Sequence, residues 1–294
     1  MILGVFPVAT MCFILISAEH WLAGQRQKAG GLALLVAVLA SILFGSLGAG
    51  VVFGAATLLG CLIGVLVERG WSYGFRLTAV TAVIFVGMVA FLAVAWDDMR
   101  HNTTIFLNAR IAEFEAQPGV DARWMEVFRW YDVNFAYIGV GSMFASVLLS
   151  VAFLLSLTDR IQSGKDGGPR RITTGFQRMR LPDWLVWVAI AVALLWFAEQ
   201  RWPNEALRFV TWNMAVALSA VYWLNGFSIL LYAMAVLKAS MPVVVLVLTG
   251  MVLLGLMHLL SMVGLFDTWY SFRVRFRRLA LRRQLGYGSD DQEL

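Results

Sequence analysis

The chain has 294 residues, of which 60% are apolar and 14% are charged, with a net charge of +5 and a mean hydropathy of +0.76. A soluble domain carries about 25% charged residues, so this composition excludes an ordinary water-soluble domain and predicts a protein that lies mostly in lipid. The two cysteines, Cys12 and Cys61, lie inside apolar runs and are too few for a disulfide framework or a thiolate metal site.

Apolar runs separated by charged or Pro/Gly-rich turns predict an all-α fold, a polytopic transmembrane helical bundle. A helix needs about 20 apolar residues to cross the hydrocarbon layer, and on this measure we expect eight spans. Their predicted ranges are 3–18, 31–47, 49–67, 78–96, 134–157, 184–200, 209–237 and 242–265. Tryptophans near several of these ends fit the head-group layer.

Small residues follow one face of the predicted third span, at Gly50, Gly54, Thr57, Cys61 and Gly64. Such a stripe lets two helix backbones approach closely in lipid, where apolar area alone does not drive association. Close helix packing is therefore the simpler interpretation. A groove for a ligand is the alternative, because an absence of side chains also leaves room.

The segment 97–133 predicts an extra-membrane helical hairpin. Apolar residues recur there at helical spacing on both sides of Pro118-Gly119, which is typical of a turn. An interfacial spacer is the simpler interpretation of such amphipathic segments, and a lid over a substrate cavity is the alternative.

The distribution of Lys and Arg orients the predicted bundle. The loop from Asp159 to Asp183 holds six basic residues, which predicts a cytoplasmic loop over 158–183 and places 97–133 outside. With three further spans the basic tail would end outside, against the same rule. A ninth span, made by splitting 209–237 at Asn225-Gly226, would restore agreement, so the side of the tail stays open with cytoplasmic favoured.

Three polar residues lie within apolar spans and are candidates for substrate binding: Asn213, Asn225 and His258. An ionisable or amide group in a span is a functional candidate, but an asparagine there also hydrogen-bonds a neighbouring helix. His258 shares a helical face with Met251 and Met262, a pattern compatible with copper. Methionine more commonly fills apolar gaps, so we expect no metal site and no cofactor.

The tail at 268–294 predicts a basic amphipathic helix on the membrane surface. Four arginines follow a span directly and are expected to contact anionic lipid head groups: Arg273, Arg275, Arg277 and Arg278. Aromatic and aliphatic residues at Trp269, Phe272, Phe276 and Leu279 would share one face, with the arginines on its flanks. Nucleic acid would attract similar charge, but no recognition fold accompanies the block, so we expect no nucleic-acid partner.

Three short stretches resemble the YybS-like family of predicted bacterial membrane proteins of unknown function. They are Leu181-Pro182-Asp183-Trp184, then Tyr222-Trp223-Leu224-Asn225-Gly226-Phe227 after Asn213, and Gly264-Leu265-Phe266-Asp267 leading to Phe272-Arg273. The usual glutamine of the family is Asn225 here. The family is distantly similar to the substrate-binding subunits of energy-coupling-factor transporters. The resemblance implies that the first five spans form a binding core, with the 97–133 hairpin over its outer mouth.

These observations predict four parts: a transmembrane core over 1–157, the cytoplasmic loop 158–183, C-terminal transmembrane helices over 184–267, and the interfacial tail 268–294. No catalytic motif is present, so we expect a protein that is not an enzyme. The leading hypothesis is a small-molecule-binding, transporter-type subunit of the bacterial inner membrane, with the lipid bilayer and a membrane protein as partners. The alternative is a non-catalytic envelope scaffold or assembly protein.

Overall fold

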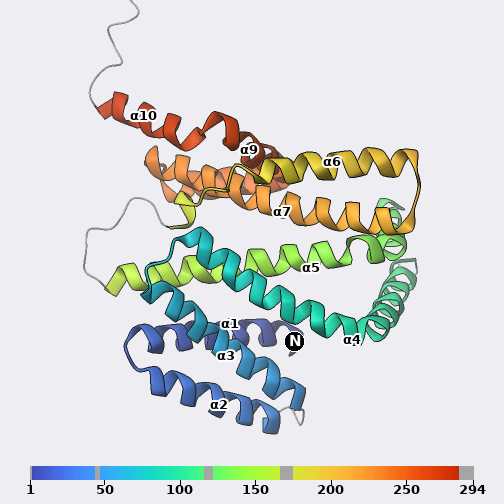
Figure 1. The fold of residues 1–294 in the computed structure, drawn as a ribbon, viewed down its shortest axis with the longest axis horizontal. Coiled ribbons are helices and arrows are strands. Elements are labelled where there is room, and N and C mark those ends of the chain that lie inside the picture. The colour runs from blue at the N-terminus through green and yellow to red at the C-terminus, as the bar shows by residue number, and fades with distance from the viewer. Residues whose placement is uncertain (1, 44–46, 116–121, 166–174, 285–294) are drawn as a thin grey trace, which may run out of the picture.

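The computed structural model describes residues 2–43, 47–115, 122–165 and 175–284, and every regular element in these ranges is a helix (Figure 1). The predicted all-α fold is confirmed. The helices are α1 Ile2–Leu22, α2 Arg26–Leu43, α3 Leu47–Glu68, α4 Tyr73–Glu115, α5 Ala122–Lys165, the short 3-10 helix η1 Phe176–Arg178, α6 Leu185–Arg201, α7 Glu205–Val236, α8 Met241–Leu253, α9 Met257–Tyr270 and α10 Phe272–Gln284.

The long helix α5 lies in the middle of the bundle. It packs against α4 on one side and α7 on the other, while α1 and α2 both pack on α3 and α9 packs on α7. Figure 1 shows the N-terminal helices in blue and the C-terminal helices in orange and red on opposite sides of α4 and α5. Fully buried residues such as Ile63, Val80 and Leu155 form the apolar core between α3, α4 and α5.

Small residues on α3 bring its backbone close to α1. Thr57, Cys61 and Gly64 are buried, and a Cβ added to Gly64 would lie 2.7 Å from the Cβ of Trp21. Gly60 makes the closest approach, since a Cβ there would overlap the carbonyl oxygen of Ile14. The predicted packing face of the third span is therefore confirmed at these positions; the surroundings of Gly50 fall outside the described residues.

The apolar run 242–265 is not a single straight helix. α8 ends at Leu253, α9 begins at Met257, and the two axes differ by 108°. Gly255 in the connection has φ +65°, a conformation that glycine adopts without steric cost. The predicted eighth span over this run is therefore a bent pair of helices, and the prediction of eight spans is not confirmed.

Helix α7 is continuous across Asn225-Gly226, so the predicted alternative of two short spans hinged there is also wrong. The side chain of Asn204 begins this helix by accepting hydrogen bonds from the backbone N–H groups of Ala206 (2.8 Å) and Leu207 (3.3 Å). Such N-terminal caps stabilise a helix by about 1 kcal/mol. The run from Glu205 to Val236 is therefore one uninterrupted helix.

The predicted hairpin over 97–133 is helical, but its helices are the ends of α4 and α5 rather than separate elements. The predicted turn at Pro118-Gly119 lies outside the described residues. Within the described ranges, three helical segments are long and apolar enough to cross a membrane, Tyr73–Ala90, Tyr137–Arg160 and Glu205–Val236. The bent pair α8–α9 adds a fourth if it is counted as one span.

Candidate functional site

The junction between α9 and α10 is a sharp turn that redirects the chain. Ser271 adopts a left-handed conformation (φ 44°, ψ 55°), which costs a non-glycine residue about 1–2 kcal/mol. The carboxylate of Asp267 stabilises the turn by accepting a hydrogen bond from the backbone N–H of Phe272 at 2.8 Å. Arg273 lies two residues after Ser271, and the turn directs its side chain back toward α7.

Arg273 is buried, with only 4% of its surface exposed, and its guanidinium is bonded on every side. Nη1 donates to Asp267 at 2.6 Å, and Nε donates to the carbonyl oxygen of Gln177 at 3.1 Å. Nη2 donates to the side-chain oxygens of Asn225 (3.1 Å) and Ser228 (2.8 Å). One cation thus ties α10 to α9, α7 and the η1 segment.

The polar groups on α7 that receive Arg273 are themselves fully engaged. The amide of Asn225 donates to the carbonyl oxygen of Gly264 on α9 at 2.9 Å, and the hydroxyl of Ser228 donates to the carbonyl oxygen of Phe176 at 2.8 Å. Because residues i, i+3 and i+7 share a helix face, Asn225, Ser228 and Tyr232 form one polar stripe. Asn225 therefore serves to join helices and to hold Arg273.

A second ion pair holds η1 in place from the other side. Arg76 on α4 pairs with Asp159 on α5 at 2.8 Å, and a Cβ on Gly175 would lie 2.6 Å from the Asp159 carboxylate. The ring of Phe176 packs edge-on against Tyr73, with centroids 5.7 Å apart. The short helix is thereby fixed between the ends of α4, α5 and α7.

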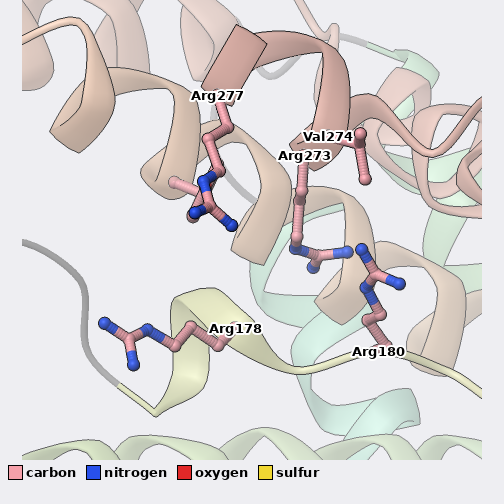
Figure 2. Close-up of a pocket in the computed structure, with 6 residues that line it drawn as sticks. Arg178, Arg180, Arg273, Val274 and Arg277 are labelled. Carbon is pink, nitrogen blue, oxygen red and sulfur yellow. The ribbon is translucent and has the colours of Figure 1, made fainter. Parts of the chain in front are cut away.

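A cavity of about 500 Å³ opens beside this network. Four of its lining residues are arginines, which come from two basic segments distant in sequence, 158–183 and 268–294. The lining residues are Arg178, Arg180, Tyr232, Arg273, Val274 and Arg277. Figure 2 shows the guanidinium groups of Arg273 and Arg180 side by side, with Arg277 reaching down from α10. We call this cavity the arginine pocket.

The arginine pocket is strongly electropositive. Burial lowers the pKa of Arg273 from its ordinary value; Asp267 opposes this shift, whereas the neighbouring positive charge of Arg180 adds to it. The residues that line the cavity include no carboxylate. Guanidinium groups are always charged and donate hydrogen bonds without accepting them, so the chemistry that this pocket supports is the binding of an anion.

The two basic segments meet at one end of the bundle. Arg273 follows α9 and contacts Ser228, which lies about 12 Å along the helix axis from the C-terminal end of α7. The α8–α9 pair therefore begins at the C-terminal end of α7 and brings the chain back alongside α7.

The other predicted binding residues do not join this site. Asn213 accepts a hydrogen bond from the backbone N–H of Gly141 at 2.7 Å and donates to the carbonyl oxygen of Phe209 at 2.9 Å, so it links α7 to α5. His258 is exposed on α9, and the break after Leu253 separates it from Met251 on α8. Of the three predicted residues, only Asn225 lies next to the arginine pocket.

The four tail arginines divide into different environments. Arg275, Arg277 and Arg278 are exposed, as expected of residues facing lipid head groups, although Arg277 also lines the cavity. The prediction that Arg273 contacts lipid head groups is wrong, because this side chain is buried and bonded to protein atoms. The predicted apolar face is also interrupted, since Ser271 separates Trp269 on α9 from the residues on α10.

Several site residues were not singled out from the sequence as a site: Gln177, Arg180, Ser228, Tyr232 and Asp267. A usable signal was present in part. Asn225, Ser228 and Tyr232 are spaced as one helical face, and Asp267 closes an apolar run six residues before Arg273. The contribution of Gln177 is a backbone carbonyl, for which side-chain patterns carry no signal.

The all-helical fold, its long apolar helices and a charge network confined to one end of the bundle define a helical membrane protein. Residues 128–268 match the model of a family described as Predicted membrane protein (DUF2232), a family of unknown function. The predicted resemblance to such a family is confirmed for this segment, which includes most of α5 and reaches Thr268 on α9. No curated protein and no solved structure matches the chain, so the further similarity to energy-coupling-factor subunits gains no support.

Proposed function

We propose that this protein is a non-enzymatic, multi-pass protein of the bacterial inner membrane that binds an anionic ligand in the arginine pocket. One observation carries the proposal: Arg273 is buried and held in fixed geometry beside Arg180 and Arg277, around a cavity of about 500 Å³. Evolved binding sites pre-position their charged groups in this way, because less freedom is then lost on binding.

The proposal keeps the ligand-binding role expected of a transporter-type subunit but assigns it to a different part of the bundle. The family resemblance implied a binding core within the first five spans, under the 97–133 segment. The side chains that line the arginine pocket come from η1, the segment that follows it, α7 and α10. Its lining offers hydrogen-bond donors rather than a nucleophile paired with a base, which supports binding rather than catalysis.

For the topology we propose seven crossings, α1 to α7, followed by an α8–α9 pair that enters and leaves on one side. The pair is bent by 108°, and its helices have 13 and 14 residues, about 20 Å each, short of the hydrocarbon thickness. Both basic segments then lie on one side, which the positive-inside rule identifies as the cytoplasm. This removes the conflict that eight straight spans create.

The exposed arginines of α10 retain their proposed contact with lipid. Arg275 and Arg278 are exposed, and Leu279 and Leu281 on the same helix are about half exposed (51% and 47%). A helix with basic and apolar residues of this kind lies in the interface of an anionic membrane. The lipid bilayer is thus a partner of α10 in addition to the ligand of the pocket.

A scaffold without a small ligand is the second candidate, favoured by a separate observation. Asn213 and Asn225 satisfy their hydrogen bonds across helix interfaces, and close glycine contacts join α7 to α9. A protein that only holds partners together would use such rigid contacts, and the pocket arginines would then serve as surface charge.

A binding measurement separates the two candidates. The full chain in a non-ionic detergent is heated with a panel of anions at constant ionic strength, and unfolding is followed by tryptophan fluorescence. Ligand binding raises the melting temperature by mass action. We expect at least one anion to stabilise the protein, and Arg180→Gln to remove that effect. Failure of every anion in the panel would favour the scaffold.

A further inference from the structure

The arginine pocket presents positive charge from two directions. Arg277 and Arg273 come from α10, whereas Arg180 comes from the segment that follows η1 on the opposite wall (Figure 2). Arg273 is held in place by Asp267, Asn225 and Ser228, so it acts as a fixed charge in the wall. An anion between these groups would be approached by donors from more than one side.

We infer that the ligand of this pocket is a phosphate ester whose phosphate binds between Arg180, Arg273 and Arg277. The inference rests on the proposed function and specifies the class of its ligand. A phosphate is tetrahedral and directs its terminal oxygens to different sides, and the guanidinium groups of Arg180 and Arg277 can each contact it with a fork of two donors. Arg273, whose donors are bonded to the protein, contributes its fixed positive charge. A carboxylate has two oxygens in one plane and suits fewer converging arginines.

Charge supports phosphate over a singly charged anion. A phosphate monoester carries about −1.5 to −2 at neutral pH. Arg180 lies close enough to Arg273 to oppose its protonation, so the two cations repel each other without an anion between them. A doubly charged group would offset this repulsion better than a single negative charge.

The dimensions and remaining lining of the pocket point to an ester rather than inorganic phosphate. A cavity of about 500 Å³ falls in the range of about 300–1,000 Å³ that holds organic ligands. Val274 supplies an apolar contact, and Tyr232 on α7 supplies an aromatic ring with a hydroxyl group. The organic part of an ester can pack against these two side chains.

The position of the pocket allows a soluble ester or a lipid head group to supply the phosphate. Tyr232 lies one helical turn before the end of α7, and Arg277 belongs to the same helix as the exposed Arg275 and Arg278. These residues lie where a membrane surface would meet the cytoplasm in the proposed topology. The soluble ester and the lipid head group have the phosphate ester in common.

The test uses the full chain in nanodiscs of phosphatidylcholine. In one arm glycerol 3-phosphate is added to the solution; in the other, one-tenth of the lipid is phosphatidic acid. Succinate is the control for a doubly charged carboxylate, and thermal stabilisation is measured against concentration. We expect stabilisation in at least one phosphate arm, and the arm that responds identifies the source.

Variants make the test specific to the pocket. Arg180→Gln and Arg277→Gln should each weaken the apparent affinity about tenfold, the effect of losing one charge-assisted hydrogen bond. Arg278→Gln removes the same charge from an exposed position on α10 and should change the affinity less than about twofold.

Three results would overturn the inference. Equal weakening by Arg278→Gln would show that phosphate follows surface charge rather than the pocket. Stabilisation by succinate as strong as that by both phosphate arms, and equally dependent on Arg180, would reject phosphate and leave the proposed anion-binding function standing. Absence of stabilisation by any anion would reject both.

Discussion

Arg273 carries a charge into the packed interior of the helix bundle, with only 4% of its surface exposed. Burying a cation is costly unless it is paired and hydrogen-bonded, and here Asp267 balances the charge while Asn225, Ser228 and the Gln177 carbonyl take up the other donors. Removal of the cation leaves the carboxylate of Asp267 buried without its partner. The arrangement therefore makes the fold dependent on both members of the pair.

This dependence predicts the effect of breaking the pair. Arg273→Gln or Asp267→Asn should destabilise the protein by about 3–5 kcal/mol, the usual cost of leaving one buried charge uncompensated. The measurement is the midpoint of unfolding in detergent, followed by tryptophan fluorescence. Arg278→Gln is the matched control and should change stability by less than about 0.5 kcal/mol, because this side chain is exposed. Equal effects of the two arginine variants would contradict the pair's structural role.

At the scale of single residues, the sequence predicted candidate residues for the site but not the contacts between them. Asn225 and Arg273 were both singled out, one as a polar residue in a span and the other as part of a basic block. Their contact joins positions 48 residues apart and depends on the left-handed turn at Ser271. No periodic pattern encodes such a turn at a serine, so Arg273 was expected at the surface with its neighbours.

Helices α7 and α9 cross at a pair of glycines. A Cβ on Gly226 would overlap the carbonyl oxygen of Leu260, and a Cβ on Gly264 would overlap that of Tyr222. Helix backbones come this close only where side chains are absent. The crossing places Asn225 within hydrogen-bonding distance of α9 and so supports the network around Arg273.

The close crossing of α7 and α9 predicts that adding one methyl group at either glycine lowers the stability of the protein. Gly226→Ala or Gly264→Ala should push the helices apart and destabilise the protein by about 1–3 kcal/mol, as overpacking does in tight interiors. Gly250→Ala on α8 is the control, because nothing lies within 4 Å of the added Cβ. Melting temperatures of the purified variants provide the comparison. Unchanged stability of Gly226→Ala would show that the helices are not in contact there.

At the break between α8 and α9, we expect a substitution of Gly255 to change stability through backbone conformation alone. Gly255→Ala should cost about 1 kcal/mol, because φ +65° is unfavourable for a residue with a Cβ although the space around it is open. The measurement is again the unfolding midpoint, with Gly74→Ala in the open first turn of α4 as the control. A stabilised Gly255→Ala variant would indicate a regular helix through this position.

At the scale of elements, hydropathy predicted where the helices lie but not where a helix is broken. The apolar run from Met241 to Gly264 looks the same whether it crosses the bilayer straight or bends, because both forms need apolar side chains. Gly255 was the one local cue in the connection, and a single glycine is tolerated inside many helices. The opposite error at Asn225-Gly226 arose because glycine there serves helix packing rather than a hinge.

For the molecule as a whole, the bend between α8 and α9 bears on the side of the membrane on which α10 lies in the proposed topology. A straight final span would send α10 to the face opposite the 158–183 segment. The contact of Arg273 with Gln177 instead brings both basic segments together. In the topology proposed above, the charge distribution and the helix geometry give the same orientation, which hydropathy alone did not provide.

Labelling of single cysteines tests this orientation. In a Cys12→Ala, Cys61→Ala background, an impermeant maleimide added to intact spheroplasts should label Pro203→Cys between α6 and α7 and leave Asp183→Cys and Leu281→Cys unlabelled. All three positions are exposed, so access to the reagent depends on their side of the membrane. Detergent treatment should make every site reactive. Labelling of Leu281→Cys in intact cells would mean that α8–α9 crosses the bilayer.

The network around Arg273 also bears on how the chain is made. Asn225 and Ser228 are synthesised before the arginine that satisfies them, and a chain that stops short of Arg273 would leave both side chains without this partner inside the bundle. Such a fragment would be loose at the junction of α7, α9 and η1. Synthesis of α10 is therefore the step that completes the packing of this junction.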